Sequence, residues 1–364
     1  MSDLEKINIY VPRETEALLS SDNEMFEVFK RGGKSVNRNL FLSMLVIGYY
    51  DAYIQERRNK HARIMSELDA VDLDVAQKTM LASRILEDVF LPARSKRLGK
   101  NARHLSLKPT EKTEHLLSKI RYDNQEADSL SMFLCRMFMS YCEKPFSQRE
   151  RIIFRQSHDT LTEACKRRQP IYFSIAGNDY IHEVIPYAIA TGQEEMFNYL
   201  LCQEENPKTR MQEACVFRLN RIRGINISDK TGSLQDDVQA KLERMKRIGP
   251  QYAINDDDEV CVKLTMKGKD LYKRIYFGRP LFEREENAAD GYLQYYMCSH
   301  NQLELYFRRF GPEAEILYPQ TLRDKIAEFH RCSLRVYEDG LNNDTGYSSS
   351  SKYIENPSST IASS

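Results

Sequence analysis

The first apolar pattern of the chain alternates with a period of two. Three apolar side chains share one face of this segment and three other side chains share the opposite face: Ile7, Ile9 and Val11 against Lys6, Asn8 and Tyr10. The alternation predicts a half-buried strand. Pro12 ends the strand and suits the first turn of a helix over residues 13–30. After Gly32-Gly33, Ser35 is a good N-cap for a second helix, in which apolar residues recur at helical spacing.

A single short strand is not stable in water without a partner strand. Since residues 1–58 contain no other strand pattern, we expect a second copy of the chain to supply the partner. The segments Asn8-Ile9-Tyr10-Val11-Pro12-Arg13-Glu14 and Ser35-Val36-Asn37 make residues 1–58 resemble the ribbon-helix-helix DNA-binding family. In that family, two strands pair antiparallel across a dimer and enter the major groove.

This resemblance implies two groups of DNA-contacting residues. The outward strand residues Lys6, Asn8 and Tyr10 would touch bases. The backbone amides of Ser35, Val36 and Asn37 would lie at a helix N-terminus, which suits a phosphate. The alternative is a ribbon that serves dimerisation alone and binds no nucleic acid.

Residues 59–168 form a predicted helical linker region. Apolar residues recur in it at helical spacing: Leu130, Phe133, Leu134, Met137, Phe138 and Tyr141. We interpret this stripe as core packing. The segment 94–108 carries several Lys and Arg residues and no acid. It is either an electrostatic arm for phosphates or a solvated linker.

From Ile171 the apolar period changes to two. The strand candidates are residues 171–175, 181–186, 196–202, 214–219 and 222–227. Short strands at this spacing predict a small β-barrel over residues 169–228. Residues 229–338 alternate strand and helix patterns and predict a compact α+β unit. The serine-rich residues 339–364 predict a disordered tail. The predicted fold class is therefore a multidomain α+β protein.

Three ordered segments of the predicted barrel resemble the WYL domain, a bacterial regulatory module with an SH3-like or Sm-like barrel. They are His182-Glu183-Val184-Ile185-Pro186-Tyr187, Phe197-Asn198-Tyr199-Leu200-Leu201 and Phe217-Arg218-Leu219-Asn220-Arg221-Ile222. Asn198 stands where the family has the Trp of its Trp-Tyr-Leu signature. The C-terminal unit resembles the extension that follows such domains, with Gly278-Arg279-Pro280 and Tyr306-Phe307-Arg308-Arg309-Phe310-Gly311.

The WYL resemblance implies a groove that binds nucleic acid or a nucleotide-like effector. The matching positions are His182, Tyr187, Tyr199, Arg218 and Arg221. Arginine offers a planar donor fork for phosphate, and tyrosine offers a stacking surface for a base. The alternative is that Arg218 and Arg221 pair with nearby acids, such as Glu183 or Glu213, and hold the barrel together.

Composition narrows the class of partner. The chain has 53 Lys+Arg and 53 Asp+Glu, so its formal net charge is zero, which excludes a polybasic protein and leaves room for a local basic site. The eight cysteines are scattered without a CxxC pair and read as reduced thiols. The sequence shows no secretory signal, and its longest apolar stretch is too short for a membrane span. We expect a cytoplasmic protein with no membrane contact.

Two groups of residues are candidates for metal-dependent chemistry. Cys298 with His300, and His330 with Cys332, could converge on zinc, and the acidic run 256–259 could bind a hard cation. Their spacings fit no standard metal motif, so we expect no metal, no cofactor and no catalytic residue. A metal-dependent nuclease stays open as the alternative function.

The sequence therefore predicts a non-enzymatic, homodimeric nucleic-acid-binding regulator. Its expected ligands are single-stranded RNA or DNA at the barrel and duplex DNA at the ribbon. Two versions remain open. One resembles the WYL accessory proteins of type VI-D CRISPR systems, which bind RNA and act with an RNA-guided ribonuclease. The other is a ligand-responsive transcription regulator.

Overall fold

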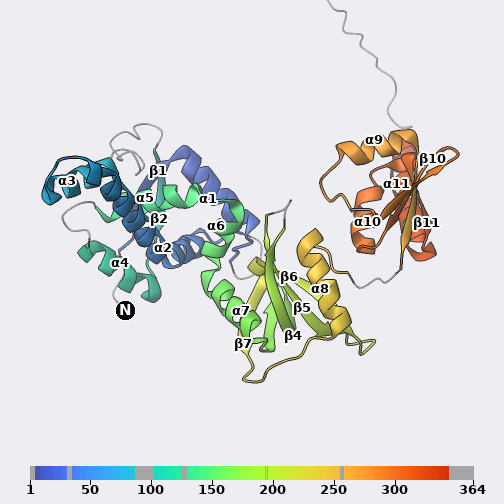
Figure 1. Cartoon of the computed structure of the whole chain (residues 1–364), viewed down its shortest axis with the longest axis horizontal. Coiled ribbons are helices and arrows are strands. Elements are labelled where there is room, and N and C mark those ends of the chain that lie inside the picture. The colour runs from blue at the N-terminus through green and yellow to red at the C-terminus, as the bar shows by residue number, and fades with distance from the viewer. Residues whose placement is uncertain are drawn as a thin grey trace, which may run out of the picture. The chain divides into compact units, whose positions relative to one another are not determined.

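The computed structural model describes residues 5–30, 35–86, 102–123, 129–192, 194, 196–254 and 258–343. The chain divides into two compact units, Met1–Asn255 and Asp256–Ser364, which are described separately below (Figure 1). Three antiparallel sheets occur within the described residues, among many helices. The predicted multidomain α+β class is confirmed.

The N-terminal region of the first unit contains two successive strand–helix–helix segments. The first comprises β1 (Ile7–Pro12), α1 (Arg13–Met25) and α2 (Arg38–Glu67), and the second comprises β2 (Ala102–Leu107), α4 (Glu111–Asp123) and α5 (Leu130–Cys142). Between them lie a short 3-10 helix (Leu68–Ala70) and α3 (Val75–Ile85). The two segments share this order of elements, and α1 and α4 are both 13 residues long.

The partner of β1 is β2 of the same chain, so the expectation that a second copy supplies it is wrong. The strands pair antiparallel, from Ile7 opposite Leu107 to Pro12 opposite Ala102. Ile9 and Leu107 are completely buried in the core that α2 and α5 also line. A two-stranded ribbon thus forms within one chain. The homodimer remains a prediction, but the need of β1 for a partner strand no longer supports it.

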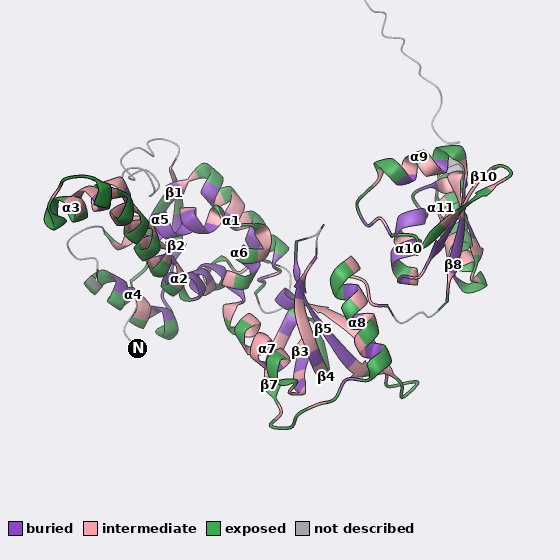
Figure 2. Ribbon diagram, in the orientation of Figure 1, coloured by how far each residue is buried: buried purple, intermediate pink, exposed green. Residues whose placement is uncertain are grey.

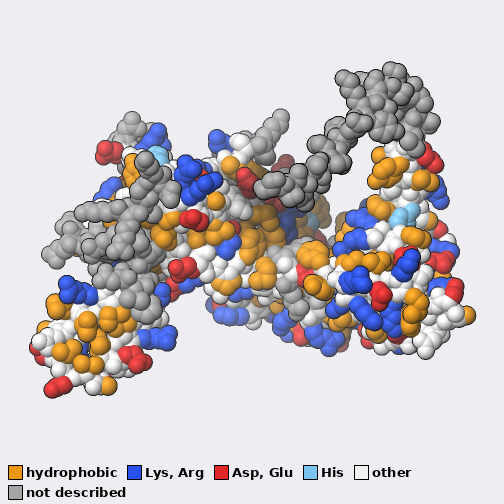
Figure 3. All heavy atoms as spheres, turned by 90° about the horizontal axis from the view of Figure 1, so that it is seen from above, with side chains coloured by type: hydrophobic (Ala, Val, Ile, Leu, Met, Phe, Trp, Pro, Cys, Tyr) orange, Lys and Arg blue, Asp and Glu red, His pale blue; other side chains and the backbone are white. Residues whose placement is uncertain are grey.

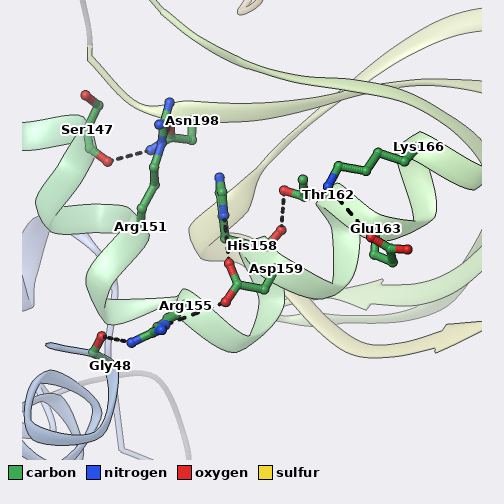
Figure 4. Close-up of polar contacts among 10 residues, drawn as sticks. All are labelled: Gly48, Ser147, Arg151, Arg155, His158, Asp159, Thr162, Glu163, Lys166 and Asn198. Carbon is green, nitrogen blue, oxygen red and sulfur yellow. Dashed lines mark hydrogen bonds and ion pairs between the residues drawn. The ribbon is translucent and has the colours of Figure 1, made fainter. Parts of the chain in front are cut away.

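Helices α6 (Phe146–Ile153) and α7 (Arg155–Arg167) connect this region to the sheet that follows. Helix α2 approaches α6 closely at Gly48, where an added Cβ would lie 2.0 Å from the backbone oxygen of Ile152. Glycine is needed here because any side chain would collide with that backbone. In the same place, Arg155 Nη1 donates to the Gly48 carbonyl oxygen at 3.1 Å (Figure 4).

The second sheet of this unit has five strands in the order β6-β5-β4-β3-β7. The strands are β3 (Ile171–Ile175), β4 (Asn178–Thr191), β5 (Asn198–Glu205), β6 (Gln212–Arg218) and β7 (Ile222–Ile227). All five were expected from the period of two. The closed barrel was not correct, because β6 and β7 lie at opposite edges and the sheet is open within the described residues.

Helices cover both faces of this sheet (Figure 2). Leu161 and Ala164 of α7 pack with Leu200 and Cys202 on one face. On the other face, Leu201 packs against helix α8 (Asp236–Ile248). Although α8 lies in the segment that we assigned to the C-terminal extension, it therefore packs on the sheet. A sheet covered on both faces buries alternate residues in two separate cores, which leaves no need for barrel closure.

The second unit holds a four-stranded sheet in the order β11-β8-β10-β9. Its elements are β8 (Val260–Leu264), α9 (Met266–Arg274), β9 (Arg284–Ala288), β10 (Gly291–Tyr296), α10 (His300–Phe307), β11 (Ala314–Tyr318) and α11 (Gln320–Asn343). These alternating strands and helices agree with the α+β pattern expected within residues 229–338. Helix α11 continues past residue 338, and the predicted tail from residue 344 onward lies outside the described residues.

Candidate functional site

Two predicted site residues meet at the β5–β6 end of the five-stranded sheet. Tyr199 on β5 and Arg218 on β6 are directly opposite in the register. The guanidinium carbon of Arg218 lies 3.6 Å from the ring centroid of Phe197, a cation–π contact that fixes the charge over the aromatic face. Arg218 Nε is buried and has no hydrogen-bond partner among the described residues. Tyr199 itself is only 4% exposed, so its ring belongs to the core and offers no stacking face in this conformation.

Arg221 lies close to this pair, in the 3-10 turn Leu219–Arg221. It forms a two-pronged ion pair with Glu27, with Nη2 to Oε1 at 2.7 Å and Nε to Oε2 at 3.1 Å. The hydrogen bond that Arg221 donates to Glu27 raises the pKa of Arg221, against the opposite effect of burial, and the Tyr199 hydroxyl also interacts with its charge. The alternative of an acid partner therefore holds for Arg221, although the acid is neither Glu183 nor Glu213.

A third arginine reaches the same place from α6. Arg151 Nε donates to Asn198 Oδ1 at 2.9 Å, and its Nη2 donates to Thr191 Oγ1 at 2.9 Å. Figure 4 shows Arg151 beside Asn198, with Ser147 accepting from the amide of Asn198 through its backbone oxygen. Arg151 thus contacts Asn198, Arg218 lies over Phe197, and Arg221 interacts electrostatically with Tyr199, so all three guanidinium groups lie near the segment Phe197–Tyr199. We call Arg151, Arg218 and Arg221 the sheet-end arginines.

A buried carboxyl lies beneath these arginines. Glu150 is completely buried, and its Oε2 accepts from the backbone and side-chain nitrogens of Asn198, each at 2.7 Å. Burial raises the pKa of Glu150 to about 7, although the bonds from Asn198 and the charge of Arg218 favour the ionised form. Near neutral pH the site therefore holds a proton that can be gained or lost.

Two other predicted site residues lie elsewhere on the sheet. His182 Nδ1 is 2.7 Å from Glu204 Oε1, and its ring stacks on Phe173 at a centroid distance of 5.5 Å. His182 lines a pocket of about 220 Å³ together with Glu204, Glu205 and Glu213, which would repel phosphate. Tyr187 donates its hydroxyl to Glu243 of α8. Burial raises the pKa of Tyr187 to about 12, and the hydrogen bond to Glu243 adds to this effect.

The ribbon residues predicted to touch DNA all face outward. Lys6, Asn8 and Tyr10 are exposed, and Tyr10 is 50% exposed. His104 of β2 joins them, because its Nε2 is 2.9 Å from Asn8 Oδ1 and its ring lies 5.5 Å from that of Tyr10. The outward face of the ribbon thus contains residues from both strands.

The segment Ser35–Asn37, whose backbone amides were predicted to bind phosphate, forms hydrogen bonds within the chain. Asn37, not Ser35, is the N-cap of α2, and its side chain accepts from the amide of Leu40 at 3.1 Å. The amide of Asn37 donates to the Val28 carbonyl at 2.7 Å, and Val36 forms a bridge with Phe29. A phosphate at Ser35, Val36 and Asn37 would have to compete with these bonds.

The residues considered for metal chemistry do not gather in the described part of the chain. Cys298 is buried in the core of the second unit, whereas Cys332 is exposed on α11 and its thiol donates to Glu328. Among the described residues, no three His, Cys, Asp or Glu side chains are placed to hold a metal ion. Asp256 and Asp257 of the acidic run lie outside those residues, and Glu259 pairs with Arg284.

Charged side chains of both signs occur on the face drawn in Figure 3, in keeping with the zero net charge. A local cluster such as the sheet-end arginines can carry positive charge although the whole chain is neutral. None of the described helices combines the length and the apolar character needed to cross a membrane.

Sequence reasoning missed one of the sheet-end arginines, Arg151, and two residues that contact the others, Glu27 and Phe197. Arg151 comes from helix α6 and Glu27 from the turn that follows α1, and no spacing rule places them beside the strands. The third residue, Phe197, lies in the WYL-like segment, but no contact was predicted for it. Its position two residues before Tyr199 gave the available signal, because residues at this spacing share one face of a strand.

Comparison with known proteins shows a shared fold. No protein-family model matches the sequence, and no curated protein matches it. The chain is similar to a solved structure described as "Crystal structure of a CRISPR Cas-related protein", with a TM-score of 0.66, 20% identity, and coverage of 93% of this chain and 95% of that chain. Proteasome accessory factor B/C (PafBC) of Arthrobacter aurescens also matches, with 16% identity, a TM-score of 0.25, and coverage of 61% of this chain and 35% of that chain.

Proposed function

We propose that this chain is a non-enzymatic, nucleic-acid-binding regulator of the kind associated with CRISPR systems, and that the sheet-end arginines bind single-stranded RNA or DNA. The observation that carries the proposal is the gathering of Arg151, Arg218 and Arg221 around Phe197–Tyr199. The fold shared with a CRISPR Cas-related protein over most of both chains supports the biological setting.

The chemistry of the cluster suits a phosphodiester. Guanidinium groups bind phosphate oxygens through paired N–H donors. Within the described residues, neither Arg151 nor Arg218 is within ion-pair distance of a carboxylate, and Arg218 interacts with the charge of Glu150 only at longer range. Arg151 is exposed, and the Arg221 side chain is 47% exposed. Phe197 holds Arg218 in place and stays in the core, so binding would rest more on phosphate contacts than on base stacking.

The test is equilibrium binding of single-stranded RNA, single-stranded DNA and duplex DNA of equal length at one fixed salt concentration. We expect Arg218→Ala with Arg221→Ala to weaken single-strand binding about 10- to 100-fold, because each change removes charged hydrogen bonds. The matched control is Lys246→Ala with Arg247→Ala, two exposed cations at the end of α8, which should leave affinity nearly unchanged. Unchanged affinity in a folded sheet-end variant would refute the proposed site.

The ribbon supports a second proposed function, which is the binding of duplex DNA. The outward side chains Lys6, Asn8 and Tyr10 lie along its antiparallel strands, as contacts with duplex DNA would require, although both strands come from one chain. We expect Lys6→Ala with Asn8→Ala to weaken duplex DNA binding about fivefold and to leave single-stranded RNA binding unchanged. If duplex binding does not change, the ribbon has a structural role.

The remaining expectations are proposals with simple tests. A homodimer would appear in sedimentation of the full chain, and binding to a CRISPR RNA-guided ribonuclease would appear in a pull-down with that enzyme. If the chain acts instead as a transcription regulator, duplex DNA should bind more tightly than single strands at equal salt. RNA cleavage that depends on added metal and is lost on chelation would favour the nuclease alternative.

A further inference from the structure

A cleft of about 930 Å³ lies between the N-terminal helices and the five-stranded sheet. Three parts of the first unit form its walls. They are residues 27–30 with α2, the first turns of α7, and the β3–β4 turn with β7. The volume is within the range of about 300–1,000 Å³ that is typical of small-ligand sites.

Much of the cleft wall is apolar. The apolar lining residues are Val28, Phe29, Leu40, Met44, Phe154, Ile222 and Ile225. Leu40 is 44% exposed and Phe29 is 40% exposed, so part of this wall faces solvent. Covering it with an apolar ligand body would release water from that surface, which favours binding.

A partly buried cation stands in this wall. Arg223 Nη1 donates to the carbonyl oxygens of Asn220 at 2.6 Å and Ile222 at 2.9 Å, which fixes the side chain. Burial lowers the pKa of Arg223, although the charge of Glu27 opposes this effect. Among the described residues, no carboxylate forms an ion pair with it. A charge removed from water without a paired counter-charge is costly, and an anionic ligand would offset that cost.

The other polar groups of the cleft complement such an anion. Lys30 is a second lining cation, and Gln156, Ser157 and Thr160 contribute an amide and two hydroxyls from α7. Glu27 is the one carboxylate among the described lining residues, and it is bound to Arg221. The cleft therefore combines an apolar wall with donors and an excess of positive charge.

We propose that this cleft binds a small organic anion. The apolar body of the ligand would lie against Leu40, Met44 and Phe154, and its carboxylate, sulfonate or phosphate group would lie at Arg223 and Lys30. The cleft adjoins the sheet-end arginines through the ion pair between Glu27 and Arg221, but the proposed anion binding does not depend on nucleic-acid binding there. Because it lies between the N-terminal helices and the sheet, a bound anion would contact both regions.

Two related probes test the proposal. Anilinonaphthalene sulfonate carries an anionic group on an aromatic body, and phenylnaphthylamine has a similar body without the charge. We expect one saturable sulfonate site per chain, measured by fluorescence titration of the full-length protein, and weaker binding of the uncharged probe. Arg223→Leu should weaken sulfonate binding about tenfold or more, whereas the control Arg247→Leu, an exposed arginine on α8, should not change it.

Since Arg223→Leu removes bonds to two backbone carbonyls, a milder pair of variants keeps the test valid if that variant does not fold. Gln156 is exposed at the start of α7, so Gln156→Glu and Gln156→Lys change charge with little effect on packing. We expect the glutamate to weaken and the lysine to strengthen sulfonate binding, with a difference of about fivefold or more, and neither to affect the uncharged probe. Absence of saturable sulfonate binding, or equal sulfonate affinity in the two variants, would overturn the proposal.

Discussion

Two buried carboxylates lie on opposite sides of α6 and are stabilised in different ways. Asp22 of α1 accepts from Arg149 Nε at 2.7 Å, from Arg149 Nη2 at 3.0 Å and from the Tyr141 hydroxyl at 2.7 Å. Glu150 follows Arg149 in α6, but its side chain faces the sheet and accepts hydrogen bonds from Asn198. One helical turn thus joins the N-terminal helices through an ion pair and joins the sheet through neutral donors.

The difference shows how one helix can hold two regions with unequal dependence on pH. Burial alone would lower the pKa of Arg149, but the hydrogen bond and charge of Asp22 raise it above its usual value, so this ion pair persists throughout the neutral range. The pKa of Glu150 is raised to about 7 by burial, so the contact with the sheet changes its protonation near neutrality. We expect the N-terminal contact to be fixed and the sheet contact to be adjustable.

Removing the fixed contact should have the largest effect. We expect Asp22→Ala to lower the free energy of unfolding of the first unit by about 3–5 kcal/mol, because Arg149 is left as a buried charge without its partner. Denaturant unfolding followed by circular dichroism measures this change. The double variant Asp22→Leu with Arg149→Met removes both charges and should cost much less. A loss of under about 1 kcal/mol for Asp22→Ala would mean that the pair is not the main link.

The contact between Glu150 and Asn198 should make the free energy of unfolding depend on pH, which is the second largest expected effect. The folded-state pKa of Glu150, about 7, lies above the unfolded value of about 4.3, so the folded protein binds this proton more tightly. Its contribution is fully present below the unfolded pKa and is lost as pH rises through about 7. We expect stability to fall by on the order of 3 kcal/mol between those values.

Glu150→Gln provides the control for this pH effect. Glutamine keeps an oxygen that can accept from Asn198 and does not titrate, so this part of the decline should disappear. The measurement is the unfolding free energy of both proteins at several pH values from about 4 to about 8. Parallel pH curves for the two proteins would show that Glu150 does not titrate in this range.

A smaller effect concerns the ion pair between Glu27 and Arg221, which spans the two regions. Glu27→Gln releases the Arg221 guanidinium, so we expect single-stranded RNA to bind about three- to fivefold more tightly, in line with the modest strength of a partly exposed ion pair. Glu205→Gln makes the same charge change at the exposed pair with Arg210 and should have a smaller effect. Equal effects of the two changes would indicate a general response to net charge.

The fold was predictable where apolar residues alternate or recur regularly. Strands β3 and β7 were expected at the residues where they occur, because their alternation is clear. Strand β2 was missed because Arg103 and His104 in a basic segment obscured the alternation of Leu105 and Leu107. The partner of β1 could not be identified, since pairing between strands about 90 residues apart depends on tertiary packing.

The site was predictable only in part, for a similar reason. The ordered motif placed Arg218 and Arg221 near Tyr199, and the structure brings these residues together. It could not indicate that Tyr199 is buried, that Arg221 is held by Glu27, or that Arg151 reaches Asn198 from a helix. These contacts join segments whose distance in sequence carries no information about their proximity.

The salt dependence of single-stranded RNA binding tests the central claim most directly. Each phosphate neutralised on a single strand contributes about −0.7 to the slope of log K against log salt concentration. If Arg218 and Arg221 each contact a phosphate, the variant with both changed to alanine should bind with a slope shallower by about 1.4. Equal slopes for the wild-type protein and this folded variant would show that neither arginine neutralises a phosphate, and would contradict the account.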